Sequence, residues 1–528
     1  MLDDKLKALW TRISPPQKAA FFGCFLSGYL VHLYVFTNII PNSDGLSRIF
    51  DPQQMTVSGR WFLHFASYFN GFTQMPAVIG LFSVLFLALA AALAVSLLGI
   101  RSRALSALSG ALMAAFPAVG YTFLYLFTAS AYCFAIFLAV LSVSLARRGR
   151  WHWLAGCLLL ACSMGTYQAY VTVAIGLSLL VIFRETLDPS ASFSATLRLG
   201  VRLMLFLAAG AVLYYGILLV FLQVSYLGMD AASSGYPFSR LPGLLLDTCK
   251  QVAAFFFLPG SANTFTSGWM AVLDLAALAL GGGCFLLCMG QEGLWRARWR
   301  PLGGLAMLAL LPLGINFGQI LSPWSAPTPL MKYAFVLVYL AVVLLADRAL
   351  PAAGAGASVL RRRAAPCAAL WLVLLLLFSL NTNNRLYTAS AQAHRATLSY
   401  ATRLASRIES CPGYTHGMPV YLIGSFPTDR VHNSVEGFAQ VDHYSVPLDT
   451  VAPLNKHIYY YLRDWLNLPI EEPAEADLMA MAERPEFAAM PRYPDDGSVQ
   501  IIDGCLVVKV QEEYTPKSDF EIAYENRR

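Results

Sequence analysis

The charged residues that could carry chemistry gather in one polar stretch near the N-terminus. Residues 41–61 read PNSDGLSRIFDPQQMTVSGRW and separate the first long apolar segment from the second. Two carboxylates and two guanidinium groups lie in this stretch: Asp44, Asp51, Arg48 and Arg60. Charged side chains at the rim of a bilayer are costly to keep, so their presence there indicates a function. We therefore expect the chemistry of this chain in residues 41–61.

Asp44 is the candidate general base of this stretch. Asn42, Ser43 and Gly45 favour a turn around it, which would present the carboxylate outward. A carboxylate whose pKa is tuned by partial burial and nearby arginines can accept a proton from an attacking sugar hydroxyl. The structural alternative is an aspartate that forms the turn and caps the next short helix.

Asp51 and Arg48 are the second pair of candidates. Asp51 lies seven residues after Asp44, on the same face and two turns away if the loop is helical. It could orient an acceptor molecule, or it could pair with Arg48.

Arg60 and Lys332 are candidates for binding a phosphate group. Arg60 could hold a lipid-linked phosphate bidentately, or it could anchor the chain among lipid headgroups. Trp61 follows it and opens an amphipathic run over residues 62–69 that suits a helix resting at the membrane interface. Lys332, at the outer end of a later apolar segment, has the same two interpretations.

The composition indicates an integral membrane protein. The 528 residues are 57% hydrophobic and 13% charged, with a mean hydropathy of +0.55, whereas soluble domains carry about 25% charged residues. Segments long enough for a bilayer core of about 20 residues recur as far as residue 380. We place eleven spans at roughly 19–40, 76–100, 104–124, 128–146, 152–164, 167–183, 203–226, 269–289, 302–321, 331–347 and 364–381.

The distribution of basic residues predicts the orientation. One alternating set of loops holds 19 Lys and Arg residues before residue 382, and the other set holds five. Basic loops stay in the cytoplasm, so the N-terminus is expected inside and the C-terminus outside, with an odd number of spans. The first apolar run follows four basic residues and suits an uncleaved signal anchor with its N-terminus in the cytoplasm. The net charge of +6 combines a balance of +13 in residues 1–381 with −7 in residues 382–528. The basic excess therefore belongs to the membrane part of the chain, and no nucleic-acid partner is expected.

Residues 152–183 are too few for two full spans, although both flanking loops are basic. A pair of shortened helices meeting at Gly165-Thr166-Tyr167-Gln168 would fit. Such a break would place Tyr167 and Gln168 part-way into the membrane, either lining a cavity or satisfying the backbone of a hairpin turn.

After residue 381 the composition changes to that of a small α/β domain. A helical pattern over 386–408 precedes two strand-like runs, 419–424 and 505–510. We therefore divide the chain into a transmembrane domain, 1–381, and an outer, periplasmic α/β domain, 382–528. Cys411 and Cys505 are the two cysteines of the outer domain, and an oxidising compartment would allow them to form a disulfide.

Nucleotide and metal signatures are absent from the sequence. It has no phosphate-binding GxxxxGK[ST] loop, no GxGxxG after a strand, and no CxxC or HExxH motif. We therefore expect no cofactor and no metal. An enzyme acting outside the cytoplasm cannot draw on soluble nucleotide-sugars, so its activated donor would reach it attached to a lipid.

These motifs resemble those of the Gtr-type glucosyltransferases of bacterial O-antigen modification. That glucosyltransferase II-like family belongs to the GT-C class of polytopic glycosyltransferases. The resemblance rests on Asn42-x-Asp44-Gly45 in the first outer loop, on Ser58-Gly59-Arg60-Trp61, and on the run from Gly165 to Tyr170. It extends to a final outer domain with a helix and a Val-Tyr-Leu-Ile-Gly strand.

The resemblance implies a polyprenyl-phosphate-glucose donor and an O-antigen or related surface glycan as acceptor. It also implies an acidic residue of the first outer loop as base, acting in an inverting transfer on the periplasmic face. A donor synthase and a donor flippase would be functional partners, and membrane lipid would surround the chain. The alternatives are a transporter or flippase for lipid-linked sugars and an O-antigen polymerase. The sequence names neither the sugar nor the linkage.

A transporter would show charged or broken helices at mid-membrane, for which Asp274 and Asn316 are the candidate residues.

Overall fold

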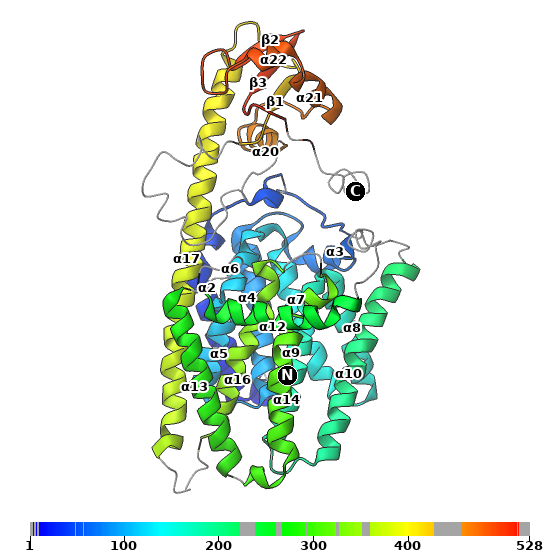
Figure 1. Ribbon diagram of the computed structural model, residues 1–528, viewed down its shortest axis with the longest axis vertical. Coiled ribbons are helices and arrows are strands. Elements are labelled where there is room, and N and C mark those ends of the chain that lie inside the picture. The colour runs from blue at the N-terminus through cyan, green and yellow to red at the C-terminus, as the bar shows by residue number, and fades with distance from the viewer. Residues whose placement is uncertain are drawn as a thin grey trace. The chain divides into compact units, whose positions relative to one another are not determined.

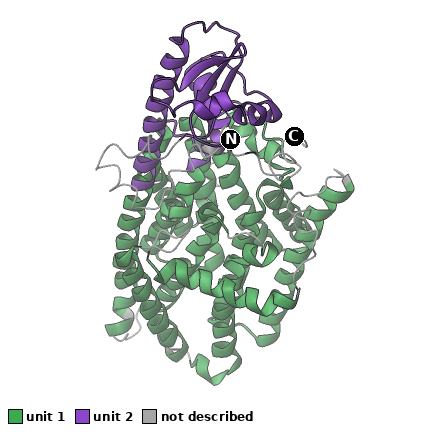
Figure 2. Cartoon of the chain, turned by 45° about the horizontal axis from the view of Figure 1, so that its top comes forward, with its two compact units in different colours: residues 1–37, 52–123, 128–384 green, residues 38–51, 124–127, 385–528 purple. Residues whose placement is uncertain are grey.

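The computed structural model describes residues 4, 7, 10–47, 49–55, 58–221, 238–259, 267–291, 293–323, 327–350, 359–426, 456–514 and 516. Two compact units share the chain (Figure 2). Unit 1 comprises residues 1–37, 52–123 and 128–384, and unit 2 comprises residues 38–51, 124–127 and 385–528. We expected one division, after residue 381. The main division falls after residue 384, and residues 38–51 group with the C-terminal part of the chain.

Unit 1 is built of helices (Figure 1). The helices of ten residues or more are α2 (Pro15–Thr37), α4 (Pro76–Leu98), α5 (Arg103–Ala115), α7 (Leu126–Ala146), α8 (Arg150–Thr166), α9 (Val171–Thr186), α10 (Phe193–Gly216), α12 (Leu241–Phe257), α13 (Gly268–Gln291), α14 (Trp299–Ile315), α16 (Val336–Arg348) and α17 (Val359–Glu409), which continues into unit 2. Shorter helical pieces join them: α6 (Pro117–Leu124), η5 (Ile217–Phe221), η6 (Phe238–Arg240), η7 (Leu294–Arg296) and α15 (Phe317–Leu321).

Nine helices of the described residues are long and apolar enough to cross a membrane. Each of the eleven predicted spans overlaps a helix of the structure. Two of them, α8 and α14, have 17 residues each, fewer than the roughly 20 that a bilayer core requires. A polytopic helical membrane protein is therefore supported, and the number eleven stays a prediction.

Two helices differ from the sequence-based expectation. The predicted last span and the helix over 386–408 form one continuous helix, α17, of 51 residues. Asn383 lies within it, and its side-chain amide donates to the Ser379 carbonyl one turn earlier, at 2.8 Å, so the polar residues do not end the helix. The other difference is α12, which we did not predict and which lies across the direction of α13 and α14 (Figure 1).

The shortened helical pair over residues 152–183 is present as predicted. Helix α8 ends at Thr166, and Tyr167 has extended backbone angles (φ −156°, ψ 114°). A single 3₁₀ turn, η4 (Gln168–Tyr170), then leads directly into α9. The break between the two helices therefore falls at Tyr167.

Several arginines that predicted the orientation hold the ends of helices. Arg300, 6% exposed, donates to the carbonyls of Thr186, Pro189 and Ala191 at 3.3, 2.9 and 2.8 Å. Arg184 donates to the carbonyl of Leu97 at 2.9 Å in the last turn of α4. The last carbonyls of a helix lack partners within it and carry a partial negative charge. These guanidinium groups therefore satisfy helix ends as well as contributing the basic charge.

Unit 2 contains a three-stranded mixed sheet in the order β1-β3-β2. Strand β1 (Val420–Ile423) is parallel to β3 (Cys505–Lys509), and β2 (Val499–Ile502) is antiparallel to it. We predicted β1 and β3 and missed β2, which joins β3 through a two-residue turn. The helical elements around the sheet are the second part of α17, α20 (Lys456–Tyr460), η10 (Tyr461–Trp465), α21 (Glu475–Ala482) and α22 (Pro485–Ala489).

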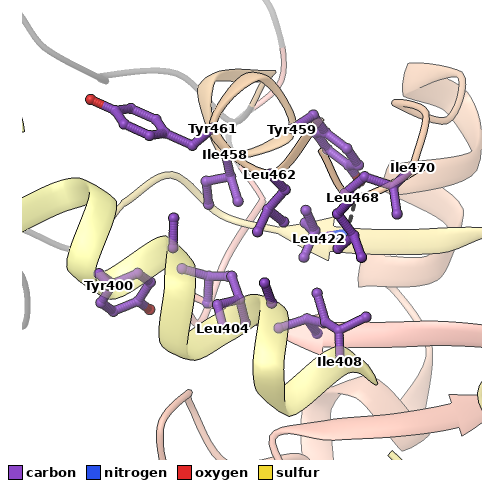
Figure 3. Close-up of a cluster of buried hydrophobic side chains, with 14 of the residues drawn as sticks. Tyr400, Leu404, Ile408, Leu422, Ile458, Tyr459, Tyr461, Leu462, Leu468 and Ile470 are labelled. Atoms are coloured by element: carbon purple, nitrogen blue, oxygen red, sulfur yellow. Dashed lines mark hydrogen bonds between the residues drawn. The ribbon is translucent and has the colours of Figure 1, made fainter. Parts of the chain in front are cut away.

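The core of unit 2 joins α17 to the sheet and to α20. Tyr400, Leu404 and Ile408 recur every four residues on one face of α17 and pack toward Leu422 of β1 (Figure 3). On the other side, the Tyr459 hydroxyl donates to the Val420 carbonyl at 3.1 Å and accepts from the Leu422 amide at 2.8 Å. This hydroxyl thus pairs with the outer edge of β1 and ties α20 to the sheet.

The predicted disulfide between Cys411 and Cys505 is absent, because both cysteines are free thiols. The Cys411 Sγ lies 4.0 Å from the carbonyl oxygen of Val499, at the first residue of β2. Cys505 pairs with Ile502 at the last residue of β2. Three residues of strand separate these positions by about 10 Å, whereas bridged cysteines have Cα atoms within about 7 Å.

Candidate active site

The first polar loop forms a turn that exposes Asp44. Residues Ser43–Gly45 make a short 3₁₀ helix, η1, and Asn42 caps it by accepting the Gly45 amide through Oδ1 at 2.8 Å. Asn42 is buried and Asp44 is exposed. Within the described part of the chain the Asp44 carboxylate has no hydrogen bond or ion pair. The capping role that we considered for Asp44 therefore belongs to Asn42, and the Asp44 carboxylate remains accessible.

The other charged candidates of this loop differ from Asp44. Asp51 is 6% exposed and engaged with another group, which makes it a poor acceptor for a proton from a bulky substrate. Arg48 lies outside the described residues. Among the described charged residues of this loop, Asp44 is the one that combines an exposed carboxylate with a capped turn.

Arg60 is enclosed by two tyrosines of unit 1. Its Nη1 donates to the Tyr132 hydroxyl at 3.0 Å, and its guanidinium carbon lies 4.8 Å from the centroid of the Tyr167 ring. The two rings stack on each other with centroids 4.4 Å apart and an interplanar angle of 15°. An arginine that snorkels freely into lipid headgroups would not be held this way. The observed cage instead fixes the direction of the guanidinium, a condition for bidentate phosphate binding.

The segment around Arg60 is fastened to the break between α8 and α9. The Gln168 side-chain amide donates to the Ser58 carbonyl at 2.7 Å and to the Tyr214 hydroxyl at 3.1 Å. The Tyr214 hydroxyl in turn donates to the Gly59 carbonyl at 3.1 Å. Gly59 has φ 74°, a left-handed conformation that favours glycine. The SGRW and GTYQAY motifs, more than 100 residues apart in sequence, therefore form one hydrogen-bonded assembly. Together with Tyr132 and Tyr214, we call this assembly the Arg60 cage.

Trp61 completes the Arg60 cage by packing against Gly165. A Cβ atom added at Gly165 would lie 2.5 Å from Cε2 of the Trp61 indole, so only glycine fits at this position. The next residue, Phe62, donates its backbone amide to the Gly165 carbonyl at 2.7 Å. Just after it, α3 (Leu63–Ala66) and η3 (Ser67–Asn70) form the short helix predicted over 62–69, with Phe65 and Tyr68 exposed.

The contact between Gly165 and Trp61 allows a prediction about the stability of the protein. Replacing Gly165 with alanine is expected to destabilise the protein by about 1–3 kcal/mol, because the added methyl group overlaps the Trp61 ring. The apparent melting temperature in detergent would fall accordingly. Gly216, a helical glycine with nothing within 4 Å of an added Cβ, is the matched control, and Gly216→Ala is expected to be neutral or stabilising. Equal melting temperatures for the two variants would contradict the prediction.

Lys332 is buried rather than placed at an open surface. It lies at a kink in η8 (Pro329–Phe335), is 7% exposed, and has its Nζ 5.9 Å from the centroid of the Phe255 ring. Element η8 packs against η4, the turn that carries Gln168. The structure thus places Lys332 on an element adjoining the Arg60 cage.

Two members of the Arg60 cage, Tyr132 and Tyr214, were missed from the sequence. Each lies inside an apolar helix, α7 or α10, where a tyrosine is unremarkable by composition. Only their hydroxyl groups distinguish these tyrosines from the apolar residues around them. Nothing in the sequence spacing indicates that residues 132 and 214 lie near residues 58–60. Only the packing of α7 and α10 brings them there.

The polar residues that could favour transport have partners within the bundle. Asp274 of α13 accepts the Tyr339 hydroxyl at 2.8 Å and is 3% exposed. Asn316, between α14 and α15, donates to the Gln251 side chain at 3.1 Å. Both contacts join neighbouring helices, which is a structural role.

No group of three or more His, Cys, Asp or Glu residues in the described part of the chain could hold a metal ion.

Comparison with known proteins gives one match. A family model described as glucosyl transferase GtrII matches residues 33–378, which is more than half of the chain. The matched region contains the first polar loop, the Arg60 cage and Lys332, and it ends before the sheet of unit 2. No curated protein and no solved structure matches the chain.

Proposed function

Since the chain belongs to the glucosyl transferase GtrII family, we propose that it transfers glucose from a polyprenyl-phosphate donor to O-antigen or a related surface glycan. The transfer takes place on the periplasmic face of the bacterial inner membrane. The single observation that carries the assignment of the reacting group is the Asp44 carboxylate, which is exposed on a capped turn and has no hydrogen bond or ion pair among the described residues.

In the proposed reaction, Asp44 takes the proton from an acceptor hydroxyl. The oxygen of that hydroxyl attacks the anomeric carbon of glucose from the face opposite the phosphate. The bond from the anomeric carbon to the phosphate oxygen breaks, and polyprenyl phosphate leaves with the electron pair. One displacement of this kind inverts the anomeric configuration.

Arg60 stabilises the negative charge that develops on the leaving phosphate. Its guanidinium is held by Tyr132 and Tyr167 before substrate binds, so little reorganisation is needed during the reaction. Lys332 and Arg48 are the proposed secondary cations. Phosphate is a good leaving group, so the reaction needs no protonated acid on the donor side.

A reconstituted transfer assay tests this function. Purified protein in nanodiscs should move glucose from polyprenyl-phosphate-glucose, and not from a nucleotide-glucose, to a lipid-linked O-antigen acceptor. The anomeric configuration of the product, read by NMR, should be opposite to that of the donor. Retention of configuration would exclude a single displacement, and movement of the lipid-linked sugar across liposomes without transfer would identify a transporter.

The proposed orientation has its own test. A reporter fused after Arg528 that is active only in the periplasm should be active, because the basic loops are expected in the cytoplasm. The same reporter fused in the basic loop after Arg148 should be inactive. Reversed signals would exclude periplasmic chemistry in the first polar loop.

A further inference from the structure

The turn that carries Asp44 belongs to the same compact unit as the C-terminal domain. Residues 38–51 and 385–528 group together in unit 2, although more than 330 residues separate them (Figure 2). The family match ends at residue 378, so the C-terminal domain lies outside it. The family assignment therefore does not indicate what the C-terminal domain does.

Leu46 links the turn to the core of this domain. Its side chain is fully buried, with 0% exposure, in the cluster formed by α17, β1 and α20. Two residues before it, Asp44 is exposed. The chain is therefore held by its apolar side chain while its carboxylate stays accessible.

Trp465 holds the backbone of the same turn. Its indole Nε1 donates to the carbonyl of Leu46 at 3.1 Å. The Trp465 ring packs edge-on against His394 of α17 at 4.6 Å between centroids, and the His394 ring nitrogen Nδ1 lies 2.9 Å from the Tyr461 hydroxyl. Trp465 ends η10, which follows α20 directly, and α20 is tied to β1 through Tyr459. The indole thus has a fixed position relative to the sheet.

Close packing at Gly45 restrains the turn as well. A Cβ atom added at Gly45 would lie 3.0 Å from Asn42 Oδ1 and 3.3 Å from the Phe127 ring. The Leu46 carbonyl accepts a hydrogen bond from Trp465, Gly45 is closely packed, and Asn42 caps η1. Asn42, before Asp44, and Gly45 and Leu46, after it, are therefore held by contacts, whereas Asp44 itself is exposed.

We propose that Trp465 is a positioning residue for Asp44, and that the C-terminal domain holds the base-bearing turn in its reactive geometry. This inference rests on the proposed function, in which Asp44 is the base. A misplacement of about 1 Å in a reacting group can cost about 10²-fold in rate, so loss of one backbone contact near the base should be measurable in turnover.

The test is Trp465→Phe in the full-length protein, which keeps an aromatic ring beside His394 and removes the donor to Leu46. The turnover number kcat is expected to fall by about 10-fold or more, with the donor KM changed less than twofold. The matched control is Trp371→Phe. Trp371 makes the same type of bond, from its indole to the Leu273 carbonyl at 2.9 Å, but it belongs to unit 1, whereas the turn belongs to unit 2. This control should keep normal turnover.

A double-mutant comparison separates positioning from general loss of structure. In an Asp44→Asn background, Trp465→Phe should lower the single-turnover rate by less than twofold further, because residues that act as a unit are not additive. Unchanged turnover in Trp465→Phe, or a full additional loss in the double variant, would overturn the positioning role alone. Full activity of Asp44→Asn by itself would instead overturn the proposed base.

A second variant covers the case in which Trp465→Phe does not fold. Gly45→Ala crowds the turn against Phe127 and leaves Trp465 in place. It should show the same selective loss of kcat and the same lack of additivity with Asp44→Asn. Normal turnover in a folded Gly45→Ala variant would count against restraint of the turn.

Discussion

Asp44→Asn is expected to lower the rate of glucosyl transfer by about 10²–10⁴-fold, the usual cost of losing a general base. Asparagine has nearly the same size and keeps the turn, because the cap of η1 comes from Asn42. The donor KM should stay nearly constant, since a base acts while the proton is being removed and contributes little to ground-state binding. Initial rates with purified protein over a range of donor concentrations measure both quantities.

A surface carboxylate of unit 2 provides the control for this substitution. Asp496 is 96% exposed and pairs with Arg407 at the protein surface. Asp496→Asn should leave transfer unchanged, because exposed ion pairs contribute about 0–1 kcal/mol to stability. If Asp44→Asn is folded and as active as Asp496→Asn, Asp44 is not the base, and Asp51 becomes the next candidate.

Arg60→Ala is expected to lower kcat/KM for the polyprenyl-phosphate donor by about 10²–10³-fold. The guanidinium would bind the phosphate in the ground state and stabilise it further as charge develops. Both a higher donor KM and a lower kcat should therefore appear, which distinguishes this variant from Asp44→Asn. The acceptor KM should change little.

Tyr132→Phe provides a graded version of the same experiment. It removes the hydroxyl that accepts from Arg60 and keeps the ring that stacks on Tyr167. A hydrogen bond to a charged group is worth about 1.5–3 kcal/mol, so a loss of roughly 10-fold or more in kcat/KM is expected. If Arg60→Ala transfers glucose at the normal rate while the protein is folded, the cage has a structural role only, and Lys332 becomes the candidate cation.

The membrane helices and two of the three strands follow from the sequence. Long apolar runs can satisfy their backbone groups inside a bilayer only as helices, so hydropathy located the segments of all eleven predicted spans, whereas it did not locate α12. The sheet strands β1 and β3 were visible as short runs rich in β-branched and aliphatic residues. Strand β2 has mostly intermediate or exposed side chains, and without a continuous apolar pattern it was not predicted.

The candidate motifs were also visible in the sequence, but their contacts with one another and their burial were not. Charged residues in a polar loop between two spans suggested function, and this reasoning singled out both Asp44 and Asp51. Only the fold distinguishes them, because burial depends on contacts with distant residues: Asp51 is 6% exposed, and Asp44 is exposed. The prediction of a disulfide was wrong for the same reason. Two cysteines can form a bridge only at a short Cα–Cα distance, and sequence spacing does not reveal that distance.

Tertiary structure alone determined what holds the two stretches that carry Asp44 and Arg60. Arg60 is enclosed by tyrosines of other helices, and the Asp44 turn is bound by Trp465, more than 400 residues away in sequence. Local sequence specifies turns and helices through interactions within a few residues. Hydrogen bonds and ring contacts between segments far apart arise only when the chain is packed, and those contacts decide which side chains are held and which remain accessible.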